Sequence, residues 1–261
     1  MLRWRDTVIN SKNTIKQEYK NLILFLLISF LLPFVAIVLQ AIVSNGFIRF
    51  VLYGVQAAAP TISAITVLCL DKKVKTYFMG MFSKEHLRIA VILPIIIAST
   101  TMILAKMIFC TLSGRSFTFG SISITQFIII LWALWAEEIR WRGYLEPLLK
   151  ELRVHKWVAP CIVGIIWCLW HYHFFLQNDM EVPILLFFIS CIIESYIYSF
   201  LMNITSNNIV SAMIYHFAWN LLIHIAALNP DNNNGSILPY IILVILETLV
   251  LLIFGSVRKA N

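Results

Sequence analysis

The chain contains eight apolar segments, each about as long as a helix that crosses a lipid bilayer. A transmembrane helix needs about 20 mostly apolar residues. The segments are residues 22–43, 48–70, 87–110, 122–139, 157–176, 183–202, 209–228 and 237–255. Because backbone N–H and C=O groups have no water to bind inside a bilayer, such segments fold as helices. The sequence therefore predicts an all-α, polytopic membrane protein with about eight transmembrane helices.

The composition agrees with a membrane protein. The chain is 60% apolar and 13% charged, whereas soluble domains are about half apolar and a quarter charged. Its net charge of +7 comes from basic residues in short clusters between the apolar segments, which is typical of cytoplasmic loops. We therefore expect a multi-pass protein of the cell membrane, with membrane lipids and no nucleic acid among its partners.

The basic clusters predict the orientation of the chain. They lie in the N-terminal arm, in the loop at residues 72–88, in the segment after residue 139 and in the C-terminal tail, whereas the opposite loops hold only Arg49 and Arg115. The positive-inside rule then places both termini in the cytoplasm. The predicted organisation is a cytoplasmic arm at residues 1–21, a single transmembrane domain at residues 22–255 and a cytoplasmic tail at residues 256–261. Residues 143–155, with leucines at helical spacing, predict an amphipathic helix on the membrane surface, or else a plain connector.

Several polar residues lie within the apolar segments. An ionisable side chain inside a bilayer costs roughly 2.5 kcal/mol or more and is a functional candidate by default. These residues are Lys106, Glu137, Glu138, His171, His173, Glu194, His216, His224 and Glu247, with Asn220 as a neutral addition.

The fourth apolar segment ends in two adjacent glutamates. Arg142 follows Glu138 by four residues, so the two side chains share one helix face and can pair. Glu137 points about 100° away from Glu138 and is free to face a cavity. The alternative is that all three residues mark the boundary between membrane and water.

The fifth and seventh segments supply histidines. His171 shares a helix face with Trp167, whereas His173 points nearly the opposite way. His216 and Asn220 are four residues apart and form a polar stripe. Such a stripe either binds neighbouring helices or lines a wet cavity, and the spacing leaves both interpretations open.

A carboxylate, two imidazoles and an amide from three helices are suited to the hydrolysis of a peptide bond. Glu137 can act as general base and then general acid, with His171 holding the water. His216 and Asn220 can donate hydrogen bonds to a developing oxyanion. The sequence has neither a serine nucleophile elbow nor an HExxH motif. A zinc site formed by Glu137, His171 and His216 remains an alternative.

Three motifs resemble those of one family. EEIRWRGYL resembles the EExxxR signature of the CPBP family, which includes the type II CAAX prenyl endopeptidases and the bacterial Abi proteins. WCLWH resembles the second motif, FxxxH, with Trp167 in place of phenylalanine, and HFAWN resembles the third, HxxxN. The motifs occur in order and the resemblance covers about residues 120–225.

The resemblance implies a role for each matching residue. Glu137 corresponds to the catalytic glutamate that activates water, and His171 to the histidine that works with it. Glu138 and Arg142 correspond to supporting residues of the first motif. His216 and Asn220 match the motif proposed to stabilise the oxyanion. The residues His173, His224, Glu194 and Glu247 match no motif and are left out of the predicted site.

The resemblance implies an intramembrane endopeptidase that acts on a membrane-associated peptide or a lipidated protein. The family is often named as metalloproteases, but its mechanism is also workable with glutamate and histidine alone. The cofactor is therefore unknown. The favoured interpretation is that none is required, and the alternative is Zn²⁺. Eukaryotic members act on prenylated CAAX proteins, and bacterial members are linked to bacteriocin immunity. The alternative functions are a non-catalytic membrane immunity or scaffold protein that retains the fold, and a transporter with a proton relay through Glu194 or Glu247.

Overall fold

The computed structural model describes residues 2–178, 180 and 182–260, with side chains between residues 15 and 255. This described part consists of helices and loops and contains no strand. The basic residues of residues 1–14 and of the tail, on which the predicted orientation partly depends, lie outside the range of described side chains. The cytoplasmic position of the two termini therefore stays a prediction.

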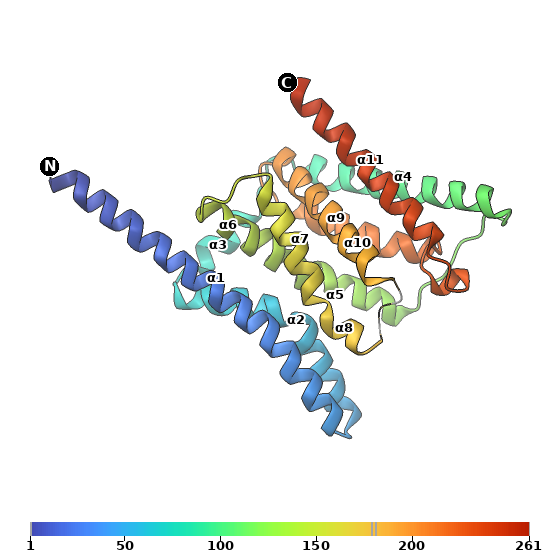
Figure 1. The fold of residues 1–261 in the computed structure, drawn as a ribbon, viewed down its shortest axis with the longest axis horizontal. Helices are drawn as coiled ribbons and strands as arrows, with labels where there is room; N and C mark the ends of the chain where they lie inside the picture. The colour runs from blue at the N-terminus through green and yellow to red at the C-terminus, as the bar shows by residue number, and fades with distance from the viewer. Residues whose placement is uncertain (1, 179, 181, 261) are drawn as a thin grey trace.

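The helices follow the apolar segments closely (Figure 1). In chain order they are α1 (Leu2–Ile42), α2 (Gly46–Leu70), α3 (Val74–Met81), α4 (Leu87–Ser113), α5 (Ile124–Arg140), the π-helix η1 (Trp141–Leu145), α6 (Glu146–Glu151), α7 (Val158–Trp170), α8 (Tyr172–Leu176), α9 (Ile184–Ile204), α10 (Val210–Ile225), the 3-10 helix η2 (Asp231–Asn233) and α11 (Leu238–Ala260).

Each of the eight predicted segments coincides with a helix or, for residues 157–176, with the pair α7 and α8. Six described helices or helix pairs are long and apolar enough to cross a membrane, so the chain is a multi-pass integral membrane protein. The helices α5 and α10 are shorter, at 17 and 16 residues, and the count of eight stays a prediction. Since α1 runs from Leu2 to Ile42, the predicted arm and the first span share one continuous helix (Figure 1).

The start of α5, which carries the two glutamates at its far end, is fixed by a capping box. The Ser123 hydroxyl accepts a hydrogen bond from the Gln126 N–H at 3.1 Å, and the Gln126 side chain accepts one from the Ser123 N–H at 2.8 Å. Two N–H groups that a helix leaves without partners are thereby satisfied. The helix is therefore held at its start as well as by its packing.

The inner helices contact one another closely. The helix α10 packs against α4, α5 and α9, and α7 packs against α9 (Figure 1). A Cβ atom at Gly164 of α7 would lie 2.7 Å from the Cα of Ile192 and 2.8 Å from the carbonyl oxygen of Cys191. Only a residue without a side chain lets the backbones of α7 and α9 approach this far, as is common between membrane helices.

The segment after α5 differs from its prediction. Residues 143–155 were expected to form an amphipathic helix on the membrane surface, but they contribute the end of η1, the six-residue α6 and a loop. Leu145, Leu148 and Leu149 are buried among other core residues of the protein. The expectation of a surface helix is wrong because these leucines face the protein core and not the lipid.

Candidate active site

The second glutamate, Glu138, is fully buried at the end of α5. Its Oε1 accepts a hydrogen bond from Arg142 Nη1 at 3.2 Å and one from His216 Nδ1 at 2.7 Å. The predicted pairing of Glu138 with Arg142 is confirmed. The contact with His216 joins α5 to α10, which the chain separates by about 70 residues.

Arg142 has further partners that hold its charge inside the protein. Its Nη2 donates to the Ser195 hydroxyl at 3.2 Å. Its guanidinium lies 3.7 Å from the ring centroid of Tyr198 and 4.7 Å from that of Trp167. A buried charge is tolerated only when it is paired and hydrogen-bonded. The surroundings of Arg142 meet this requirement with a carboxylate, a hydroxyl and two aromatic faces.

The first glutamate, Glu137, points to a different set of neighbours. Its Oε2 accepts a hydrogen bond from Trp167 Nε1 at 2.9 Å and forms an ion pair with Arg140 Nη2 at 3.1 Å, although that second contact lacks the alignment of a hydrogen bond. The side chain is 14% exposed, whereas that of Glu138 is 0% exposed. Of the two carboxylates, only that of Glu137 is accessible.

Trp167 brings the predicted site residues together. Its ring centroid lies 6.0 Å from that of His171 and 6.3 Å from that of His216, and its indole N–H donates to Glu137. Glu137 is also within electrostatic range of both histidines. The tryptophan that departs from the family motif is therefore at the centre of the cluster and adds a donor that phenylalanine lacks.

His171 lies at the junction of α7 and α8, where the backbone leaves the α-helical conformation. Its Nδ1 is 2.8 Å from the Trp167 carbonyl oxygen, to which an Nδ1–H donates. In the neutral ring this leaves Nε2 with its lone pair, ready to accept a hydrogen bond from water. The ring also packs against Trp170 and Phe187, with centroid distances of 4.9 Å in both cases.

Asn220 lies one turn after His216 on α10, as the sequence predicts. Its Nδ2 donates one hydrogen bond to the His216 carbonyl oxygen at 3.2 Å. An amide nitrogen carries two hydrogens, so a second donor remains for another acceptor. His216 is buried, whereas Asn220 is half-buried.

The residues do not form a metal-binding cluster. Among the described residues, no three His, Cys, Asp or Glu side chains lie close enough together to hold one ion. The side-chain arrangement does not fit the alternative zinc site of Glu137, His171 and His216.

Among the contacts that sequence reasoning missed, one is an ion pair with Glu137. Arg140 was grouped with the cytoplasmic basic residues, but its side chain is fully buried. Besides pairing with Glu137, it donates to the Ala57 carbonyl oxygen at 3.0 Å and lies 3.8 Å from the Trp170 ring centroid. Its position three residues after Glu137 was the available signal, since side chains at this spacing meet on a helix.

The polar residues left out of the predicted site have other partners. His173 is buried, with Nδ1 2.7 Å from Gln56 Nε2. Glu194 accepts a hydrogen bond from the Ser190 hydroxyl at 2.8 Å, and Glu247 accepts one from Trp219 Nε1 at 2.5 Å. His224 Nδ1 is 2.9 Å from Asn229 Nδ2.

Comparison with known proteins agrees with the motifs. A family model described as "Type II CAAX prenyl endopeptidase Rce1-like" matches residues 119–222, which include all three motifs. The protein "CAAX prenyl protease 2" of Methanococcus maripaludis is 29% identical over 124 residues, which are 44% of this chain and 45% of that protein. The alignment therefore spans less than half of that relative. Residues 119–222, which carry the three motifs, are therefore similar to CAAX prenyl endopeptidases.

Proposed function

We propose that the chain is an intramembrane endopeptidase in which Glu137 activates a water molecule to hydrolyse a peptide bond. The observation that carries this proposal is the difference in exposure and in hydrogen-bond partners between the two glutamates. Glu138 is enclosed and paired with Arg142 and His216, whereas Glu137 is accessible and lies beside Trp167 and His171. A buried ion pair supports a site, and an accessible carboxylate next to an imidazole is suited to proton transfer.

The contacts of Glu137 suggest how the water is held. Its Oε2 is occupied by Trp167 and Arg140, so Oε1 is the oxygen that takes a proton from water. His171 Nε2 accepts the second hydrogen of that water and orients its lone pair toward the substrate carbonyl. The new C–O bond produces a tetrahedral intermediate. Glu137 then passes its proton to the leaving amine as the C–N bond breaks.

His216 and Asn220 are the proposed donors to the oxyanion of this intermediate. Because the Nδ1–H of His216 donates to Glu138, its Nε2 can donate as well only when the ring carries both protons. The buried carboxylate of Glu138 stabilises such an imidazolium. Asn220 uses one amide hydrogen in its bond to the His216 carbonyl, and its second amide hydrogen is the other donor to the oxyanion. Both groups are preorganised, which is the main source of oxyanion stabilisation in enzymes.

The substrate class follows from similarity alone. The matching family model and the relative are both described as CAAX prenyl proteases. We propose a membrane-associated peptide or lipidated protein as the substrate. The predicted link to bacteriocin immunity stays a prediction.

The test is a comparison of membrane peptidomes from cells that carry the wild type or Glu137→Gln. Loss of a general base costs about 10²–10⁴ in rate, so peptides produced by the wild type should disappear from the variant. The matched control is Glu85→Gln, which removes an exposed carboxylate from a loop. Identical peptidomes for the wild type and Glu137→Gln would contradict the proposal. A phenotype that survives Glu137→Ala with His171→Ala would support the non-catalytic immunity or scaffold function instead.

A further inference from the structure

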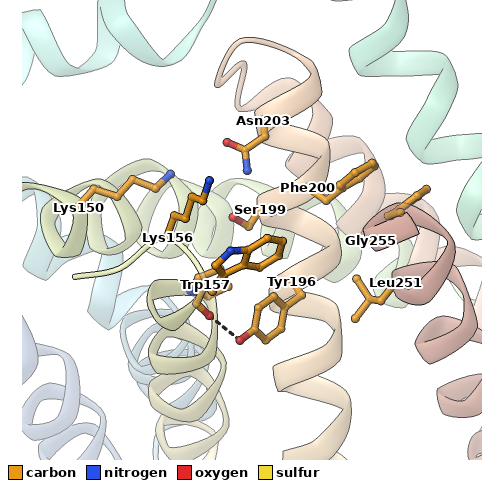
Figure 2. Close-up of a pocket in the computed structure, with 11 residues that line it drawn as sticks. Lys150, Lys156, Trp157, Tyr196, Ser199, Phe200, Asn203, Leu251 and Gly255 are labelled. Atoms are coloured by element: carbon orange, nitrogen blue, oxygen red, sulfur yellow. Dashed lines mark hydrogen bonds between the residues drawn. The ribbon is translucent and has the colours of Figure 1, made fainter. Parts of the chain in front are cut away.

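A cavity lies apart from the candidate active site, between the start of α7, α9 and α11 (Figure 2). Its volume is about 150 Å³ and it is open to the surface. None of the six predicted site residues lines it. The proposed peptidase mechanism therefore assigns this cavity no role.

One end of the cavity carries positive charge. Figure 2 shows the ammonium groups of Lys150 and Lys156 and the amide of Asn203 gathered there. Lys150 Nζ lies 3.0 Å from Glu146 Oε1, which also accepts a hydrogen bond from the Ser199 hydroxyl at 2.8 Å. The Lys150 side chain is still 40% exposed, so its ammonium retains hydrogens for a ligand. Since Glu146 offsets one of the two lysines, this end of the cavity has a net positive charge.

The rest of the cavity is apolar and aromatic. Its wall includes Trp157, Phe200, Leu251 and Phe254. The rings of Phe200 and Phe254 are stacked, with centroids 3.8 Å apart and an angle of 8° between their planes. The Tyr196 hydroxyl donates to the Trp157 carbonyl oxygen at 2.6 Å and ties α9 to the start of α7 (Figure 2).

The apolar wall continues beyond this cavity. Phe254 also lines a second, almost wholly apolar cavity of about 360 Å³ between α4 and α11. Its other walls include Ile97, Leu104 and Leu246. A molecule with an anionic group at the lysines could therefore extend an apolar chain past Phe254 along α11.

We propose that the cavity binds one anionic phospholipid, with its phosphate at Lys150, Lys156 and Asn203 and an acyl chain against Leu251 and Phe254. Basic residues beside a membrane attract anionic headgroups, and Trp and Tyr favour the level of the headgroups. The adjacent cationic end and apolar wall match the two halves of a lipid. A free phosphate would use only the first half and leave the apolar wall uncovered.

The test is native mass spectrometry of the full-length protein in detergent with added phosphatidylglycerol or phosphatidylcholine of identical acyl chains. The wild type should retain phosphatidylglycerol in preference to phosphatidylcholine. Lys150→Gln with Lys156→Gln should reduce the apparent affinity for phosphatidylglycerol about tenfold, because each basic residue near an anionic surface contributes measurably to binding. The matched control is Lys75→Gln with Lys84→Gln, which removes the same charge from exposed lysines that do not line the cavity.

A further variant guards against misfolding of the double variant. Asn203→Asp places a negative charge beside the phosphate position and should lower the affinity while the thermal unfolding curve stays unchanged. Equal retention of the two lipids by the wild type would overturn the proposal, as would an equal loss in the control pair. Displacement of phosphatidylglycerol by glycerol 3-phosphate at the same concentration would also overturn it, because the apolar wall would then add nothing. None of these outcomes depends on peptidase activity, so the lipid site and the proposed function are tested separately.

Discussion

Breaking the ion pair between Glu138 and Arg142 should strongly lower the stability of the folded protein, although the pair takes no direct part in the proposed chemistry. Both side chains are 0% exposed, and the pair is joined at 3.2 Å. Removing one partner of a buried pair costs about 3–5 kcal/mol, because the other charge stays buried without compensation. Glu138 keeps its contact with His216 when Arg142 is replaced, so we expect about 3 kcal/mol for Arg142→Gln.

A double-mutant cycle isolates this pair. Glu138→Gln and Arg142→Gln are made singly and together, and unfolding is followed by heating in detergent and by titration with SDS. At about 2–4 °C per kcal/mol for a chain of this size, each single variant should lower the Tm by on the order of 10 °C. The double variant should lose less than the sum of the two single losses, because it leaves no uncompensated charge.

The control cycle uses Glu18 and Lys73, a pair at 3.1 Å in which the lysine side chain is 49% exposed. Glu18 is buried but Lys73 is half-exposed, so solvent screens this pair and its coupling energy should be smaller than that of Glu138 and Arg142. If the two cycles gave equal coupling, or if the losses at Glu138 and Arg142 were additive, the interpretation of this pair as a buried structural support would be refuted.

Two further predictions concern single contacts. Trp167→Phe keeps the aromatic ring but removes the hydrogen bond to Glu137, so kcat/KM on a substrate found by peptidomics should fall about tenfold, as expected for a charged hydrogen bond; unchanged kinetics would show that the indole N–H does not position Glu137. Gly164→Ala should destabilise the chain by about 1–3 kcal/mol, since the new Cβ meets the backbone at Ile192, whereas Gly54→Ala, with open space around it, should stabilise by up to about 1 kcal/mol. Thermal unfolding in detergent should show a lower Tm for Gly164→Ala and a higher Tm for Gly54→Ala. An equal change in Tm for the two variants would contradict the close approach of α7 and α9.

The helical architecture could be predicted from the sequence because few structures other than a transmembrane helix explain an apolar run of about 20 residues. The eight segments coincide with helices, and the ends differ by only a few residues at most positions. The pairing of Glu138 with Arg142 was also predictable, because four residues in a helix fix the direction of both side chains. Each of these predictions uses information that is local in the chain.

The surroundings of Arg140 and the course of residues 143–155 could not be predicted in the same way. A rule that counts every arginine beside a span as a loop residue cannot recognise one that lies between an acidic side chain and Trp170. Leucines at helical spacing likewise fit a lipid surface and a protein core equally well. Which of the two they face depends on whether another helix covers them, and that is decided by residues distant in the sequence.

The π-helix η1 determines how α5 and α6 are related. Its wider turn is closed by the Glu146 N–H, which donates to the Trp141 carbonyl oxygen five residues earlier. Compared with an α-helix, this turn contains one extra residue, and one residue corresponds to a rotation of about 100°. If the same residues formed a regular α-helix instead, everything after the turn would rotate by about 100° and Leu148 and Leu149 would turn away from the core. The π-turn therefore accommodates one residue more than an α-helix would, while α6 keeps the orientation that buries its leucines.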